Sequence, residues 1–109
     1  FSQQLGFMKR PKGFNIDPHV HQRVQREVTY TSEVLFIKSG SVRCDFFRSD
    51  QSYFKSVILK SGDVILLCDG GHGFAFLEES EIVEVKQGPY LSVRDKVRFK
   101  AADFDPSLL

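Results

Sequence analysis

The stretch EVLFIKSGSVRCDFF, which runs from Glu33 to Phe47, decides the fold of this chain. It holds two short runs rich in β-branched and aromatic residues, separated by Ser39-Gly40. Runs of this length and composition favour β-strands over helices, and glycine supplies the backbone angles that a tight turn requires. The stretch therefore predicts two consecutive strands, at residues 33–38 and 41–47.

The same pattern continues toward the C-terminus. Between and after the runs, the breaks are rich in Gly, Asp and Ser, and no amphipathic helix of ten or more residues interrupts the series. After the Gly88-Pro89 break, the pattern predicts one last edge strand at 95–99 and then a frayed tail. The chain is therefore predicted to be all-β, with further strands at 53–59, 64–67, 73–77 and 82–86.

Length and charge narrow the class of protein. The 109 residues predict one domain, 1–109, with its core at about 13–87 and a C-terminal edge segment at 88–109. The net charge of +1 argues against nucleic acid or an anionic membrane as partner, because both require a concentrated positive face. No apolar run reaches the roughly 18 residues that span a bilayer, and the polar opening is unlike a signal peptide. We therefore expect a cytoplasmic protein.

The chain has two cysteines, Cys44 and Cys68, and they do not form a CxxC motif. Two cysteines are too few for a disulfide scaffold, so both thiols are expected to be reduced. A Cys44–Cys68 bridge remains open at this stage.

Six short strands in a domain of this size can bury their apolar faces only as two packed sheets or as a closed barrel. Residues 34–37 and 64–67 are apolar on both faces of their strands and need cover on both sides. A partner subunit or an N-terminal strand would cover the outer side. We expect a homodimer.

The three histidines of the chain fall in two short segments. His19 and His21 are two residues apart, and an extended strand directs such a pair to one face. His72 follows the Gly70-Gly71 turn, and Glu33 opens a strong strand. Imidazole and carboxylate together suit a divalent Zn, Fe, Mn, Ni or Cu ion, so these four residues form a candidate metal site.

These residues resemble the two signature motifs of the cupin family. The first motif is Gly, five residues, His-x-His, a short gap, Glu, six residues, Gly, and here it corresponds to Gly13, His19, His21, Glu33 and Gly40. Eleven residues separate His21 from Glu33, where the family usually has three or four, which indicates a lengthened loop at 22–32. Glu27 lies nearer the usual spacing and is the rival fourth ligand.

The second cupin motif begins at Gly62 and reaches His72 through Asp69-Gly70-Gly71. It departs from the family pattern in three places, because Cys68 replaces the usual Pro, the final gap is one residue short, and Phe76 stands where the Asn would be. The resemblance covers residues 13–87. It implies a double-stranded β-helix, also called a jelly-roll barrel, with a metal ion held by His19, His21, Glu33 and His72.

The wider sequence texture resembles a small bacterial cupin subgroup associated with surface-polysaccharide and sugar modification. This resemblance implies a metal-dependent cupin that acts on a small polar metabolite, a sugar or sugar-nucleotide derivative, by isomerase, epimerase or dioxygenase chemistry. The alternative is a metal-containing domain that binds or senses a carbohydrate without turnover. No residue stands out as a general base, so no catalytic residue is assigned.

Four further residues are candidates for contacts with a small-molecule ligand: Arg23, Arg26, Glu27 and Tyr90. A guanidinium fork fits a carboxylate or phosphate, provided that the 22–32 loop overhangs the pocket. Otherwise the two arginines are solvated loop charges, and Tyr90 packs against an edge strand.

Overall fold

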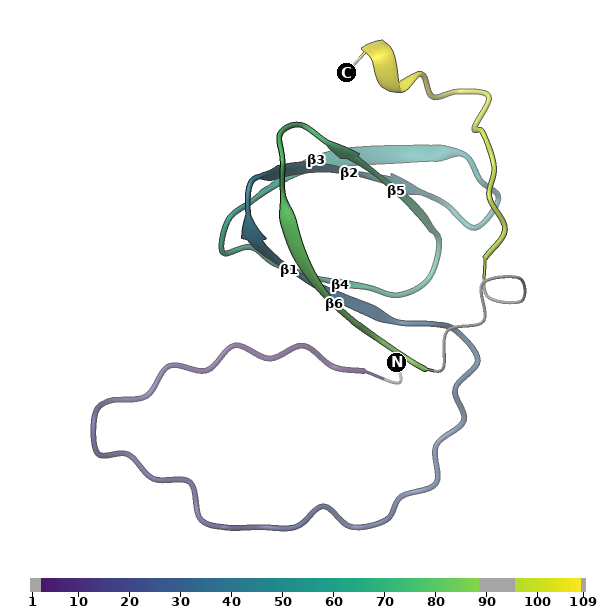
Figure 1. Cartoon of the computed structure of the whole chain (residues 1–109). Coiled ribbons are helices and arrows are strands. Elements are labelled where there is room, and N and C mark those ends of the chain that lie inside the picture. The colour runs from purple at the N-terminus through teal and green to yellow at the C-terminus, as the bar shows by residue number, and fades with distance from the viewer. Residues whose placement is uncertain (1–2, 89–95, 109) are drawn as a thin grey trace.

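Two three-stranded antiparallel sheets make up the body of the molecule (Figure 1). The computed structural model describes residues 3–88 and 96–108. The all-β prediction is confirmed: the described ranges contain six strands, no α-helix and one short 3-10 turn, η1 (Pro106–Leu108). None of the helical structure in these ranges is long and apolar enough to cross a membrane. The strands are β1 (Glu33–Ser39), β2 (Ser41–Phe47), β3 (Tyr53–Lys60), β4 (Val64–Leu67), β5 (Gly71–Phe76) and β6 (Glu81–Lys86).

The strand order is β4-β1-β6 in one sheet and β3-β2-β5 in the other. Consecutive strands β1 and β2 therefore belong to different sheets, and the chain crosses between them at Gly40. Gly40 has a φ of 95°, and a Cβ atom there would lie 2.6 Å from the Glu79 carbonyl oxygen. Only glycine fits this turn without strain. Within the described residues, no strand pairing joins the edges of the two sheets.

The core lies between the two sheets. Leu35 and Ile37 face it from β1, and Val42 and Cys44 face it from β2. Leu59 and Leu67 complete the buried cluster. The alternation of these positions places Glu33 on the inner face of β1 and Arg43 and Asp45 on the outer face of β2.

The C-terminal segment covers the outer face of the β3-β2-β5 sheet (Figure 1). The rings of Phe99 and Phe104 contact the Phe47 ring edge to face, with centroids 5.2 and 5.3 Å away. The Asp103 carboxylate accepts the backbone N–H of Tyr53 at 3.0 Å. Residues 96–99 form no strand, so the predicted edge strand at 95–99 is wrong over these four residues, and Asp95 lies outside the described ranges. The segment packs through side chains instead of a backbone ladder.

The N-terminal segment, residues 3–32, contains no strand and extends away from the two sheets (Figure 1). A turn interrupts it where Phe14 donates its N–H to the Pro11 carbonyl at 3.2 Å, with Gly13 at a φ of 87°. Its large apolar side chains, including Phe14 and Val20, are exposed. The segment therefore contributes little to the core of this chain as described.

Candidate functional site

Glu33 and His72 meet in the space between the two sheets. The Nε2 atom of His72 lies 3.2 Å from Oε2 of Glu33. The Glu33 side chain is 9% exposed and that of His72 is 28% exposed, so the pair is open to solvent mainly on the histidine side. The contact joins β1 of one sheet to β5 of the other. The structure thus brings together two of the four predicted metal ligands.

The turn before β5 positions His72. Gly70 has a φ of 86°, and a Cβ atom there would lie 2.7 Å from the Phe47 carbonyl oxygen. Asp69 stabilises the turn by accepting the Gly70 N–H at 2.8 Å. Because this turn packs directly on the end of β2, it fixes the register of β5 against β2. In this register His72 lies opposite Phe46 on the inner face.

His19 and His21 form a second, separate pair. Both are exposed and lie in the N-terminal segment, with ring centroids 5.3 Å apart. The Nδ1 atom of His19 lies 2.9 Å from the Asp17 carbonyl oxygen. Across residues 3–88 and 96–108, no three His, Cys, Asp or Glu side chains are grouped so as to hold a metal ion. The four-ligand site therefore stays a prediction, with its two halves apart.

The candidate ligand-binding residues lie mostly outside the body of the molecule. Arg23, Arg26 and Glu27 are all exposed in the N-terminal segment, and Tyr90 lies outside the described residues. Glu27, the rival ligand, is exposed, whereas Glu33 is buried against His72.

Two charged residues of β6 were not singled out from the sequence. Lys86 is paired with Glu33 in the register of the sheet, and Glu84 is paired with Leu35. Paired residues of neighbouring strands project to the same face, so both side chains share the inner face with Glu33. The Nζ atom of Lys86 lies 2.8 Å from Oε1 of Glu84, and the Lys86 side chain is 19% exposed. The signal in the sequence is the alternation Ile82, Glu84, Lys86 against Val83, Val85.

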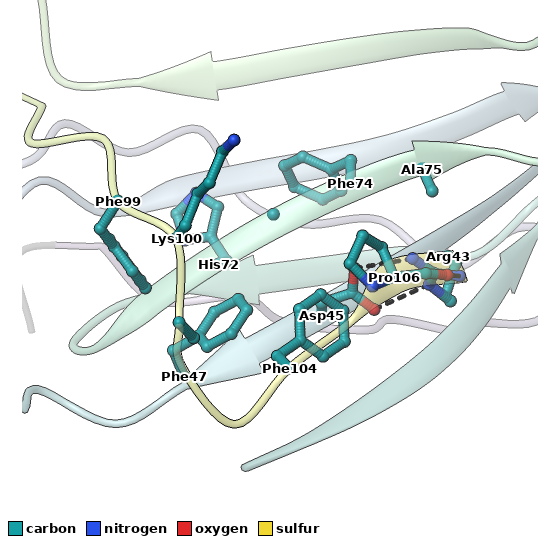
Figure 2. A pocket seen from close by; sticks show the side chains of 12 residues that line it. Arg43, Asp45, Phe47, His72, Phe74, Ala75, Phe99, Lys100, Phe104 and Pro106 are labelled. Atoms are coloured by element: carbon teal, nitrogen blue, oxygen red, sulfur yellow. Dashed lines mark hydrogen bonds and ion pairs between the residues drawn. The ribbon is translucent and has the colours of Figure 1, made fainter. Parts of the chain in front are cut away.

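A cavity of about 450 Å³ lies beside β5 and the C-terminal segment (Figure 2). Its wall includes His72 and Phe74 of β5, and Figure 2 shows the rings of Phe47, Phe99 and Phe104 around it. Aromatic rings and a small number of polar groups are typical of pockets that bind small molecules.

A buried ion pair forms another part of the cavity wall. Arg43 Nε donates to Asp45 Oδ1 at 2.8 Å, and Nη2 donates to Oδ2 at 3.2 Å. Ser56 Oγ also donates to Asp45, at 2.6 Å, and Arg43 Nη1 donates to the Pro106 carbonyl at 3.3 Å. The contact with Pro106 attaches the C-terminal segment to the sheet at this side of the cavity.

The two cysteines are free thiols. Cys44 is buried in the core and Cys68 is half-buried. Burial, and to a smaller extent the neighbouring Asp45 carboxylate, raises the pKa of the Cys44 thiol from 9.0 to about 12. Cys44 is therefore a neutral core residue and not a metal-binding thiolate.

Comparisons with protein-family models, with characterised proteins and with solved structures find no match to this chain. A functional assignment therefore depends on the site itself. Its two described elements are the Glu33–His72 contact and the cavity that His72 helps to line.

Proposed function

We propose that this chain is a metal-dependent cupin that acts on a small polar metabolite, a sugar or sugar-nucleotide derivative. The observation that carries the proposal is the Glu33–His72 contact, which places a carboxylate and an imidazole 3.2 Å apart between the two sheets, with His72 also in the wall of the cavity. Both residues hold motif positions of the cupin resemblance. The proposed complete fold is a double-stranded β-helix in which the N-terminal segment supplies further strands.

The open edge of β5 offers a place for the other two histidines. Within the described part of the chain, β5 stands at the end of its sheet, so one side of its backbone has no strand partner. From 14 to 31 the N-terminal segment alternates, with mostly apolar residues at even positions and polar residues at odd positions. Such alternation is typical of a strand that is covered on one face. An extended segment adds readily to an open sheet edge.

Strand addition at β5 would satisfy both faces of the segment. If the odd positions take the face of His72, then His19 and His21 come beside the Glu33–His72 pair. The even positions, such as Phe14 and Val20, then face the side of Gly73 and Ala75, where the cavity has its aromatic rings. Between residues 14 and 31 the large apolar side chains are 51% exposed or more without this pairing, which supports the arrangement.

The proposed site of His19, His21, Glu33 and His72 combines three imidazoles and one carboxylate, a donor set suited to Zn, Fe, Mn or Ni. A bound ion of this type would supply Lewis-acid polarisation of substrate oxygens. In the described structure the Glu33 and His72 donor atoms already face each other at 3.2 Å, which fits two ligands of one ion.

Lys86 and Glu84 are the proposed proton-handling groups. The Lys86 side chain is largely buried, shares the inner face with Glu33 and is held by Glu84 at 2.8 Å. A lysine in such a position can hold a proton at Nζ beside a bound ligand. This pair favours isomerase or epimerase chemistry, in which a proton is moved within the substrate.

A carbohydrate-binding domain without turnover is the second candidate. The rings of Phe47, Phe99 and Phe104 at the cavity favour it, because aromatic faces pack against the apolar face of a sugar ring. The two candidates share His72, which lies both in the cavity wall and beside Glu33. Turnover of a sugar derivative by the metal-loaded protein separates them.

The decisive experiment is elemental analysis of protein purified without chelator. We expect one divalent ion per chain in the wild type and in Glu27→Gln, and strongly reduced metal in His72→Ala and Glu33→Gln. Glu27→Gln is the matched control, because it removes an exposed carboxylate at the rival position. Equal metal in wild type and His72→Ala would refute the proposal. The His19→Ala, His21→Ala double variant tests the N-terminal strand separately, since full metal content there would exclude that segment from the site.

A further inference from the structure

The outer face of the β4-β1-β6 sheet is apolar. In the register of the sheet, Val34 lies between Leu66 and Val85, and Phe36 lies between Val64 and Val83. These side chains share the face that points away from Leu35 and Ile37. We call this set the apolar outer face: Val34, Phe36, Val64, Leu66, Val83 and Val85.

The apolar outer face has no cover in the described chain comparable to that of the other sheet. Phe36 is 39% exposed, Val64 44%, Val83 50% and Val85 54%. On the other sheet, by contrast, the C-terminal segment packs Phe99 and Phe104 against the outer face. An exposed contiguous apolar patch of this kind marks an interaction surface.

The polar and apolar side chains of β6 are on the opposite faces from those expected of a strand at the protein surface. Its valines, Val83 and Val85, point outward, whereas Glu84 and Lys86 share the inner face with Glu33. A strand with solvent on its outer side normally places its polar residues there. The outward valines therefore indicate that another apolar surface covers β6.

We infer that this face binds the same face of a second copy of the chain, forming a two-fold symmetric dimer. The charges around the face favour a second copy of the chain as the partner, rather than a strongly anionic or cationic molecule. Lys38 and Glu81 form an exposed ion pair at 3.7 Å near one end of the face, so both signs are present at its rim. The net charge of the chain is +1, so two copies repel each other little. An isologous interface requires a surface of this type, apolar at the centre and of mixed charge at the rim.

The area of the interface implies a contribution from the N-terminal segment. Six partly exposed side chains fall short of the roughly 800 Å² that each partner buries in a stable interface. The first part of the N-terminal segment, residues 3–13, precedes the part proposed to pair with β5 and lies on the side of the apolar outer face (Figure 1). It exposes Leu5 at 42%, Phe7 at 94% and Met8 at 62%. These side chains would extend the apolar contact of each copy.

The test is the mass of the intact protein in solution, measured by sedimentation velocity over a range of micromolar concentrations. We expect the wild type to have twice the mass of the chain. Val83→Lys places a charge at the centre of the contact and is expected to weaken dimerisation at least about tenfold. Ile58→Lys is the matched control, because Ile58 is 49% exposed on the other sheet, and it should remain dimeric. Val85→Lys is a second variant in case Val83→Lys fails to fold by circular dichroism.

A monomeric wild type at all concentrations would overturn the inference, and it would indicate that the chain's own N-terminal segment or a different protein covers the face. Equal dimerisation of Val83→Lys, Val85→Lys and the wild type would also overturn it, because the dimer would then use another surface. Metal content is measured on the same samples. A metal-free dimer refutes the proposed function alone, and a metal-loaded monomer refutes the dimer alone.

Discussion

Replacing Asp45 by Ala is expected to destabilise the fold by about 3–5 kcal/mol, because it leaves the Arg43 guanidinium buried without its carboxylate. The side chains of Arg43 and Asp45 are 8% and 5% exposed, so water does not compensate for the lost contact. Removing Asp45 abolishes two charge-assisted bonds from Arg43, at 2.8 and 3.2 Å, and one bond from Ser56 at 2.6 Å.

The remaining contacts of Arg43 are weaker. Its Nη1 atom still donates to the Pro106 carbonyl at 3.3 Å, and its guanidinium carbon lies 6.0 Å from the centroid of the Phe104 ring. A bond to a charged group contributes about 1.5–3 kcal/mol, so two lost bonds correspond to about 3–6 kcal/mol, which overlaps the expected loss. Small domains are stable by about 5–15 kcal/mol, so the Asp45→Ala variant should be close to unfolding.

Urea denaturation followed by far-UV circular dichroism measures this change. The comparison includes Arg43→Met, and Arg43→Met combined with Asp45→Leu, in which no charge is left unpaired. The combined variant should cost much less than the sum of the two single changes. Glu81→Ala is the control, because it breaks the exposed pair with Lys38 and should cost less than about 1 kcal/mol. A loss below about 1 kcal/mol in Asp45→Ala, or strict additivity, would refute the reasoning.

Three further outcomes follow from the structure. Gly40→Ala should lower the free energy of unfolding by more than about 2 kcal/mol, because the new Cβ atom would lie 2.6 Å from the Glu79 carbonyl oxygen. Gly62→Ala should lower it by only about 1 kcal/mol, because Gly62 has a φ of 92° but open space around the Cβ position. Equal losses in the two variants would contradict the packing argument. A thiol reagent should label one cysteine per native chain, Cys68, and two after unfolding, whereas rapid labelling of both in the native state would contradict the burial of Cys44. The pKa of the Cys44 thiol is about 12 in the folded state against an ordinary 9.0, so above pH 9.0 the folded state retains a proton that the unfolded state loses. The melting temperature should therefore fall as the pH rises above 9.0. The Cys44→Val variant should show a shallower fall.

The strand pattern was predictable because it depends on local periodicity. The runs at 33–38 and 41–47 coincide with β1 and β2, and Gly40 separates them as expected. The start of β5 was placed two residues late, at 73 instead of Gly71, because glycines that normally mark a turn here also begin the ladder with Phe47. Residues 96–99 alternate between polar and apolar side chains, as a strand does. Such alternation shows that one face of a segment is buried, but it does not show whether the backbone pairs with a neighbouring strand. In the structure Phe99 packs on the Phe47 ring, and residues 96–99 form no strand.

The candidate site was predictable only in part. The residue types and motif spacing put Glu33 and His72 in one candidate set, but their 3.2 Å contact depends on how two different sheets face each other. Lys86 and Glu84 were missed because the alternation in β6 separates them from Val83 and Val85 without showing which set faces inward. That choice depends on the register of β6 against β1.

Local sequence was sufficient to locate the six strands approximately, the glycine turns between them, and the histidines and carboxylates that are candidates for one site. Those properties arise from backbone angles and side-chain alternation between near neighbours. Three features are visible only in the folded molecule: β1 and β2 belong to different sheets, Arg43 and Asp45 are buried under the C-terminal segment, and the β4-β1-β6 sheet keeps an exposed apolar face. These features depend on contacts between residues far apart in the chain. The local pattern is compatible with several strand pairings, and the packing of the two sheets against each other selects one of them.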